Sequence, residues 1–191
     1  MDEQDLAKQI ATIEQMMLKT KEELSDKSFF YLLWGFAVFI CSIVQYILLK
    51  MLLPHSQMVW IAMPVVAIIH IVYSIKQKQQ NKHLTYSTLA LNALWTALGI
   101  SFFILTFISY QLSFYSLAIF ILLYGIGTYT SGKIIEFKPL IYGGIGCFIL
   151  SIVITFIDGA EQYLILALST LIAFIIPAFL LRKEYKEQKN Q

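Results

Sequence analysis

The stretch FFYLLWGFAVFICSIVQYILL, residues 29–49, contains no Asp, Glu, Lys or Arg. Because an α-helix rises about 1.5 Å per residue, this stretch is long enough to cross a hydrocarbon core about 30 Å thick. The charged residues 1–28 before it lack the short basic region and brief apolar stretch of a secretory signal peptide. We therefore expect a retained membrane-spanning helix at 29–49 that also directs insertion into the membrane.

Five more apolar stretches follow, and the six expected spans are 29–49, 58–75, 88–109, 113–131, 138–157 and 162–181. Apart from Lys138 at the edge of the fifth, no span contains Asp, Glu, Lys or Arg. A charge at the centre of a span would cost several kcal/mol, so this pattern supports membrane insertion. The predicted fold class is an all-α integral membrane protein, with a bundle of six transmembrane helices over residues 29–181.

The composition excludes several other classes of protein. Hydrophobic residues make up 58% of the chain and charged residues 14%, against roughly 25% charged in an average globular domain. A soluble core of this size would leave much apolar surface exposed, so the lipid bilayer is the expected partner. The net charge of +2 is too small to indicate nucleic-acid binding. Cys41 and Cys147 lie in apolar stretches without zinc-site spacing, so we predict no metal and no cofactor.

The orientation of the spans follows from the distribution of Lys and Arg, which accumulate on the cytoplasmic side. If the N-terminus is inside, Lys50 is the only one of the 14 Lys and Arg residues on the outer side. The sequence therefore predicts a multi-pass protein of the cell (cytoplasmic) membrane with both termini in the cytoplasm. Residues 182–191 form a basic cytoplasmic tail in this interpretation.

Residues 1–28 are predicted to form an amphipathic cytoplasmic helix. Its apolar positions follow the alternating four-and-three spacing of a coiled-coil seam: Leu6, Ile10, Ile13, Met17, Thr20 and Leu24. Acidic residues outnumber basic ones here, which disfavours a helix lying on anionic lipid. We expect the helix to pair with a second copy or with a cytoplasmic protein. A solvated extension of the first span is the main alternative.

Two spans carry small residues at helical spacing, which lets helix backbones approach closely in lipid. The third span has Ala93, Ala97 and Ser101, and the fifth has Gly143, Cys147, Ser151 and Thr155. Packing within the bundle is the favoured interpretation, and a surface that lines a substrate path is the alternative. The pairs Trp34-Gly35, Trp95-Thr96 and Tyr142-Gly143 also open the odd-numbered spans, as three related hairpins would require.

Polar side chains inside the spans are the candidate functional residues. His70 is the only ionisable candidate there, six residues after Pro64, which can kink its helix. The imidazole either relays protons or stays neutral and bonds to another span. With His70, the candidate path for a solute comprises Asn92, Thr96, Tyr124 and Gly143.

The sequence lacks the motifs of several kinds of chemistry. The spans hold no carboxylate pair for ion coupling, and the chain has no HExxH motif, no Gly-x-Ser-x-Gly motif and no phosphate-binding loop. We therefore expect no enzyme activity and predict no catalytic residue. The leading hypothesis is a protein that acts through assembly or partner binding. A small transporter or channel for a neutral or weakly polar solute, and a membrane-embedded enzyme acting on lipid, stay as alternatives.

Overall fold

The computed structural model describes residues 12, 28–29, 31–78, 86–112 and 115–189, and these are helical apart from short connections. Six helices are long and apolar enough to cross a membrane: Tyr31–Lys50, Ser56–Ile75, Tyr86–Ser109, Ser116–Ile134, Lys138–Phe156 and Glu161–Lys183. The described part contains no strand, which confirms the predicted all-helical fold. The amphipathic helix predicted at 1–28 lies outside the described residues, except for its last residue and Thr12.

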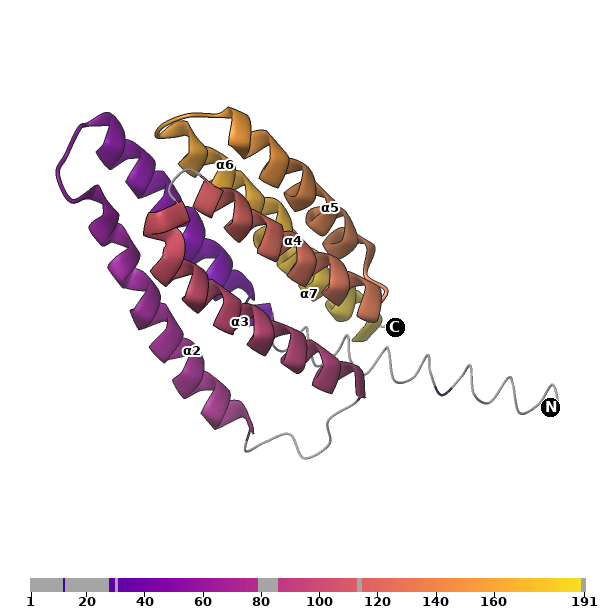
Figure 1. Ribbon diagram of the computed structural model, residues 1–191. Helices are drawn as coiled ribbons and strands as arrows, with labels where there is room; N and C mark the ends of the chain where they lie inside the picture. The colour runs from indigo at the N-terminus through magenta and orange to yellow at the C-terminus, as the bar shows by residue number, and fades with distance from the viewer. Residues whose placement is uncertain (1–11, 13–27, 30, 79–85, 113–114, 190–191) are drawn as a thin grey trace.

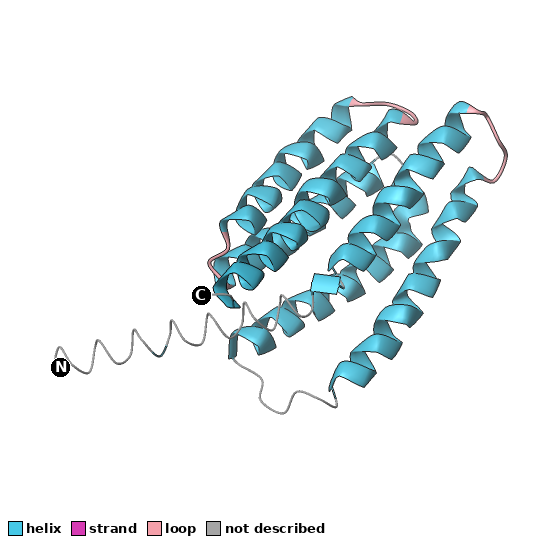
Figure 2. Ribbon diagram, turned by 180° about the vertical axis from the view of Figure 1, so that it is seen from behind, coloured by secondary structure: helices cyan, strands magenta, loops and turns pink. Residues whose placement is uncertain are grey.

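The helices run up and down as three successive hairpins (Figure 1). The first helix, Tyr31–Lys50, is followed by η1 (Ser56–Ile61), α2 (Ala62–Lys78), α3 (Tyr86–Leu112), α4 (Ser116–Ile134), α5 (Lys138–Val153), η3 (Ile154–Phe156), α6 (Glu161–Thr170), η4 (Leu171–Ile175) and α7 (Ile176–Lys189). The view from behind shows α2 at one edge of the bundle, beside the first helix (Figure 2). No residue from 57 to 75 is buried, so this hairpin arm contributes little to the core.

Glycines bring α4 and α5 into backbone contact, and these two share the most extensive contact among the labelled helices. A Cβ placed on Gly144 would lie 2.6 Å from the backbone N of Tyr129, and one on Gly132 would lie 2.7 Å from the backbone N of Ile141. Real Cβ atoms do not approach other atoms so closely. Glycine is therefore required at both positions for this helix pair to pack.

The first and last spans are joined at both ends of the bundle. At one end, the Lys50 ammonium forms an ion pair with the Glu161 carboxylate. At the other end, the guanidinium of Arg182 donates a hydrogen bond to the hydroxyl of Ser28, which is fully buried. Between them, a Cβ on Gly35 would lie 3.0 Å from side-chain atoms of the sixth span. The first helix thus packs along the sixth span, although the two are far apart in the sequence.

The small residues of the fifth and third spans lie in different surroundings. Gly143, Cys147 and Ser151 are buried, and Thr155 is half-buried in η3. The thiol of Cys147 lies 3.6 Å from the Ser169 carbonyl oxygen of the sixth span. In α3, Ala93 and Ala97 are exposed and Ser101 is half-buried. Their predicted role in packing within the bundle therefore stays a prediction.

We predict that Gly144→Ala lowers the free energy of unfolding by about 1–3 kcal/mol, because the added methyl group forces α4 and α5 apart. Denaturant titration in mixed micelles, followed by circular dichroism, measures this change. The matched control is Gly99→Ala in α3, where an added Cβ would have no neighbour within 4 Å. That substitution is expected to be neutral or to stabilise by about 0.5–1 kcal/mol. Equal losses for both variants would contradict the role of the α4–α5 contact.

Candidate functional site in the polar and aromatic interior

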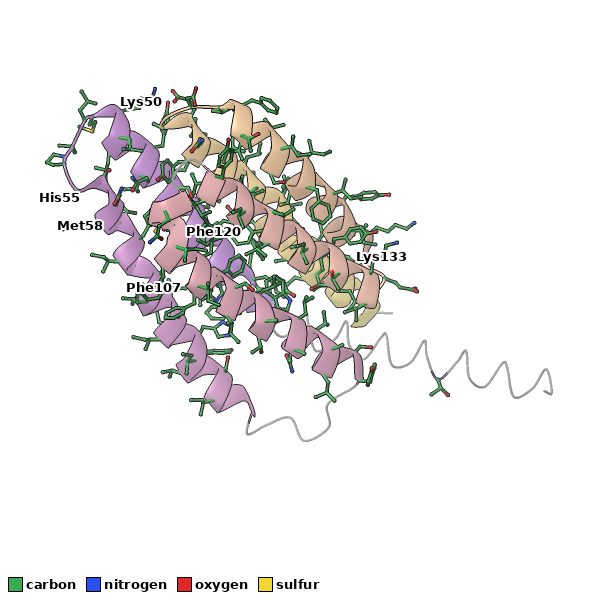
Figure 3. The ribbon with its side chains drawn as sticks, viewed as in Figure 1. Lys50, His55, Met58, Phe107, Phe120 and Lys133 are labelled. Atoms are coloured by element: carbon green, nitrogen blue, oxygen red, sulfur yellow. The ribbon has the colours of Figure 1, made fainter. Side chains whose placement is uncertain are left out.

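Aromatic rings from four spans fill the middle of the bundle. Ring centroids are separated by 5.5 Å for Tyr31–Trp95, 5.9 Å for Trp95–Phe174, 5.2 Å for Phe174–Tyr124 and 5.1 Å for Tyr124–Phe102. Phe120 of α4, labelled in Figure 3, stacks on Phe102 of α3 at 6.0 Å. Edge-to-face and tilted pairs at these distances are attractive beyond their buried area. This aromatic centre fixes the first, third, fourth and sixth spans relative to one another.

A hydrogen bond between α3 and α4 lies beside the aromatic centre. The Trp95 indole N–H donates to the Ser131 hydroxyl at 3.2 Å. Trp95 is half-buried and Ser131 is fully buried. Without this bond, the two polar groups would have no water in reach to bond to instead. The bond therefore specifies how α3 sits against α4.

The first hairpin contains an equivalent hydrogen bond. The Trp34 indole N–H donates to His70 Nδ1 at 3.0 Å, from the first helix to α2. Because Nδ1 accepts here, the bond favours a neutral imidazole that carries its proton on Nε2. This contact matches the interpretation of His70 as a neutral side chain bonded to another span.

Both tryptophans donate to a residue 36 positions further along the chain. The first two hairpins therefore share one inter-helix contact, in addition to the faint sequence similarity noted above. In the third hairpin the aromatic residue is Tyr142, which is 68% exposed. The similarity of the three hairpins does not extend to this contact.

The five residues of the predicted solute path do not meet at one place. His70 is half-buried against the first helix, while Asn92 and Thr96 are exposed on α3. The Thr96 hydroxyl donates to the Asn92 carbonyl oxygen of its own helix at 2.7 Å. Tyr124 lies in the aromatic centre, and Gly143 is buried against η4. A path through these five residues stays a prediction.

The sixth span is interrupted by the π-helical turn η4, which ends two residues before Pro177. The backbone N–H of Ile176 bonds to the carbonyl oxygen of Leu171, five residues earlier. Pro177 has no backbone N–H, so the Ile172 carbonyl loses both of its next helical donors. A Cβ on Gly143 would lie 2.5 Å from that oxygen, so only glycine fits there. The close approach is typical of a weak Cα–H···O contact between α5 and the sixth span.

A small cavity lies beside Pro177. Its volume is about 10 Å³, and Tyr31, Leu140, Ala178 and Leu181 line it together with the proline. This volume is near the lower limit for one water molecule. The break in the sixth span and this cavity lie at the same level of the bundle.

Sequence reasoning missed most of the residues that build this interior. It identified Tyr124 and Gly143, but it gave no role to Ser131 or Phe174 and used Trp34 and Trp95 only as markers of a repeat. The equal 36-residue spacing from each tryptophan to a polar residue was the available signal. Helical periodicity does not reveal it, because the two partners lie on different helices.

The chain matches no family model, no curated protein sequence and no solved structure. Among the residues that the structure describes, no group of three or more His, Cys, Asp and Glu side chains is placed to hold a metal ion.

We predict an energetic coupling of about 1 kcal/mol between Trp95→Phe and Ser131→Ala, because the two variants break the same hydrogen bond. Trp95→Phe alone leaves the buried Ser131 hydroxyl without its donor, and the second substitution removes that penalty. A double-mutant cycle of unfolding free energies measures the coupling. The control cycle combines Ser131→Ala with Trp60→Phe. Trp60 lies in η1, away from Ser131, so the two effects are expected to be additive. Additivity in both cycles would show that the bond contributes nothing.

Proposed function

We propose that this chain is a multi-pass protein of the cytoplasmic membrane, with both termini in the cytoplasm, that acts through assembly. Six apolar helices of spanning length support the membrane location. Lys50 and Lys133 lie at opposite ends of the bundle (Figure 3), and most of the other basic residues fall at the Lys133 end under the positive-inside rule. In this proposal the bundle is a scaffold, and its outer faces and residues 1–28 make the contacts.

The observation that carries the proposal is the exposure of Asn92 on α3. A carboxamide facing lipid has no hydrogen-bond partner there, and satisfying it across a helix contact is favourable. Ala93 and Ala97, also exposed, allow another helix to approach closely. A carboxamide both donates and accepts, so Asn92 can pair with Asn92 of a second copy across a two-fold axis. A second copy of this chain is therefore the partner we favour.

We predict that the full chain is an oligomer in lipid nanodiscs and that Asn92→Leu shifts it towards the monomer, because the carboxamide contact is lost. Native mass spectrometry measures the stoichiometry. Thr106→Val is the matched control, since the Thr106 hydroxyl is exposed on the same helix but bonded to its own Phe102 carbonyl at 2.8 Å.

Deletion of residues 1–26, and Ile10→Asp with Ile13→Asp, test the separate contribution of the N-terminal segment. An oligomer that survives Asn92→Leu but not the deletion would place assembly in the N-terminal segment. A full chain that is monomeric and co-purifies with nothing would refute assembly altogether.

A second candidate function is a transporter or channel for a small neutral or weakly polar solute. The interruption of the sixth span at η4 and Pro177 favours it, because transporter sites are commonly built where a transmembrane helix departs from regular α-helix. The break leaves the Ile172 carbonyl without a helical donor, which is the kind of backbone group that such sites use.

For this candidate we predict that proteoliposomes take up glycerol or urea faster than empty liposomes, and that Pro177→Ala slows uptake, because it restores a backbone N–H to the sixth span. Light scattering after an osmotic step measures uptake. Pro64→Ala is the control, since Pro64 is exposed on α2. Uptake equal to that of empty liposomes would exclude these two solutes and remove the support for transport.

A further inference from the structure

Three buried polar atoms of the first helix lack a hydrogen-bond partner among the described residues. One is the Tyr31 hydroxyl oxygen, and the other two belong to residues three positions apart. These two are the Ser42 hydroxyl oxygen and the Gln45 side-chain carbonyl oxygen Oε1. Ser42 is 0% exposed and Gln45 is 1% exposed. Leaving a buried polar atom unpaired is costly, and membrane-spanning segments have no water from lipid to supply the partner. The pair therefore points to a molecule that satisfies both atoms.

One end of the Gln45 carboxamide is bonded to a neighbouring residue. Gln45 Nε2 donates to the hydroxyl of Ser56, at the start of η1, at 3.2 Å. With the nitrogen held there, Oε1 remains as an acceptor. The thiol of Cys41 lies 3.7 Å from the Val59 carbonyl oxygen, so η1 packs along this side of the first helix. The region between the first helix and η1 is thus lined by polar groups.

Ser42 differs from four other buried hydroxyl residues of the helices. Ser169, Thr170, Ser151 and Thr128 each donate to a carbonyl oxygen three or four residues earlier, at 2.7–2.8 Å. This local bond is the usual way for a helix to satisfy a hydroxyl without water. The hydroxyl of Ser42 makes no such bond. It is therefore free for a partner that comes from outside the helix.

The spacing of the two residues suits one small molecule. Ser42 and Gln45 are three residues apart, so they lie on one face of the helix with Cβ atoms about 5–6 Å apart. They do not bond to each other, and a molecule placed between them would reach both. The nearest charged side chain along the helix is Lys50, which is paired with Glu161 at the end of the bundle. The lining offers neutral oxygen atoms, which suits a neutral hydrogen-bonding molecule.

We propose that Ser42 and Gln45, with Ser56 positioning the carboxamide, form a binding site for one small neutral molecule that carries an O–H or N–H group. The molecule donates to Gln45 Oε1 and exchanges a hydrogen bond with the Ser42 hydroxyl. Water and a small organic alcohol share this chemistry. The site lies in the second half of the first helix, near Lys50 and beside η1. It is independent of the assembly surface on α3.

The test is the sign of the effect of Ser42→Ala on the thermal unfolding midpoint of the full chain in nanodiscs. Loss of a bound molecule lowers the midpoint by about 2–4 °C. An empty site gives the opposite sign, because the substitution then removes an unsatisfied hydroxyl. The control is Ser169→Ala, whose hydroxyl bonds to its own helix, and it changes the midpoint less. A higher midpoint for Ser42→Ala would overturn the proposal.

A double-mutant cycle with Gln45→Leu separates the loss of a shared molecule from any other effect of the Ser42→Ala substitution on stability. A shared molecule makes the two losses less than additive, whereas additive losses would also overturn the proposal. If Ser42→Ala does not fold, Ser42→Cys keeps the shape with a weaker donor, and its midpoint is expected to fall below that of the wild type. Repeating the measurement with added glycerol then shows whether the bound molecule is an organic alcohol or water. A rise in midpoint that is larger for the wild type than for Ser42→Ala indicates an organic alcohol, and equal rises indicate water.

Discussion

In a bilayer, where we propose that this bundle lies, apolar side chains gain no hydrophobic free energy by turning from lipid to another helix. Packing then depends on how closely the helix backbones can approach. The contact of α4 with α5 meets this requirement, since Gly132 and Gly144 leave no room for a side chain between the two helices. The other face of α5 repeats the arrangement, with Gly143 against the Ile172 carbonyl oxygen. α5 therefore joins α4 to the sixth span, and the other helices are arranged around this layer.

Polar groups then determine which helix neighbours which. Trp95 with Ser131 and Trp34 with His70 each join the two arms of one hairpin. The bond from Arg182 to Ser28 joins the first and last spans, far apart in the sequence. Each of these bonds is satisfied at a single relative placement of two helices, whereas aliphatic contacts allow sliding. The structure thus combines close glycine contacts for stability with a few directional bonds for specificity.

The number, length and order of the apolar helices could be predicted from the sequence. Bilayer thickness sets the length of an apolar stretch, and the cost of a buried charge sets where each stretch begins and ends. The fifth span, expected at 138–157, is observed at Lys138–Phe156. The direction in which side chains face could not be predicted, since the exposed and the buried positions of these helices are equally apolar. Ala93 and Cys147 belong to similar stripes of small residues, yet Ala93 is exposed and Cys147 is buried. The partner of Trp34 and the turn η4 depend on tertiary contacts, which short-range periodicity does not encode.

The π-helical turn has a consequence for how the chain tolerates insertions and deletions. A π-turn accommodates one residue more than an α-helical turn, and each residue of an α-helix corresponds to a rotation of about 100°. The π-turn takes up this extra residue within one turn, so the residues after it keep the faces that they would have in a regular helix one residue shorter. Deleting any one of residues 171–175 would restore the ordinary hydrogen-bond register and leave Arg182 facing Ser28. A deletion elsewhere in the sixth span, with no such turn to absorb it, would rotate Arg182 away from Ser28 by about 100°.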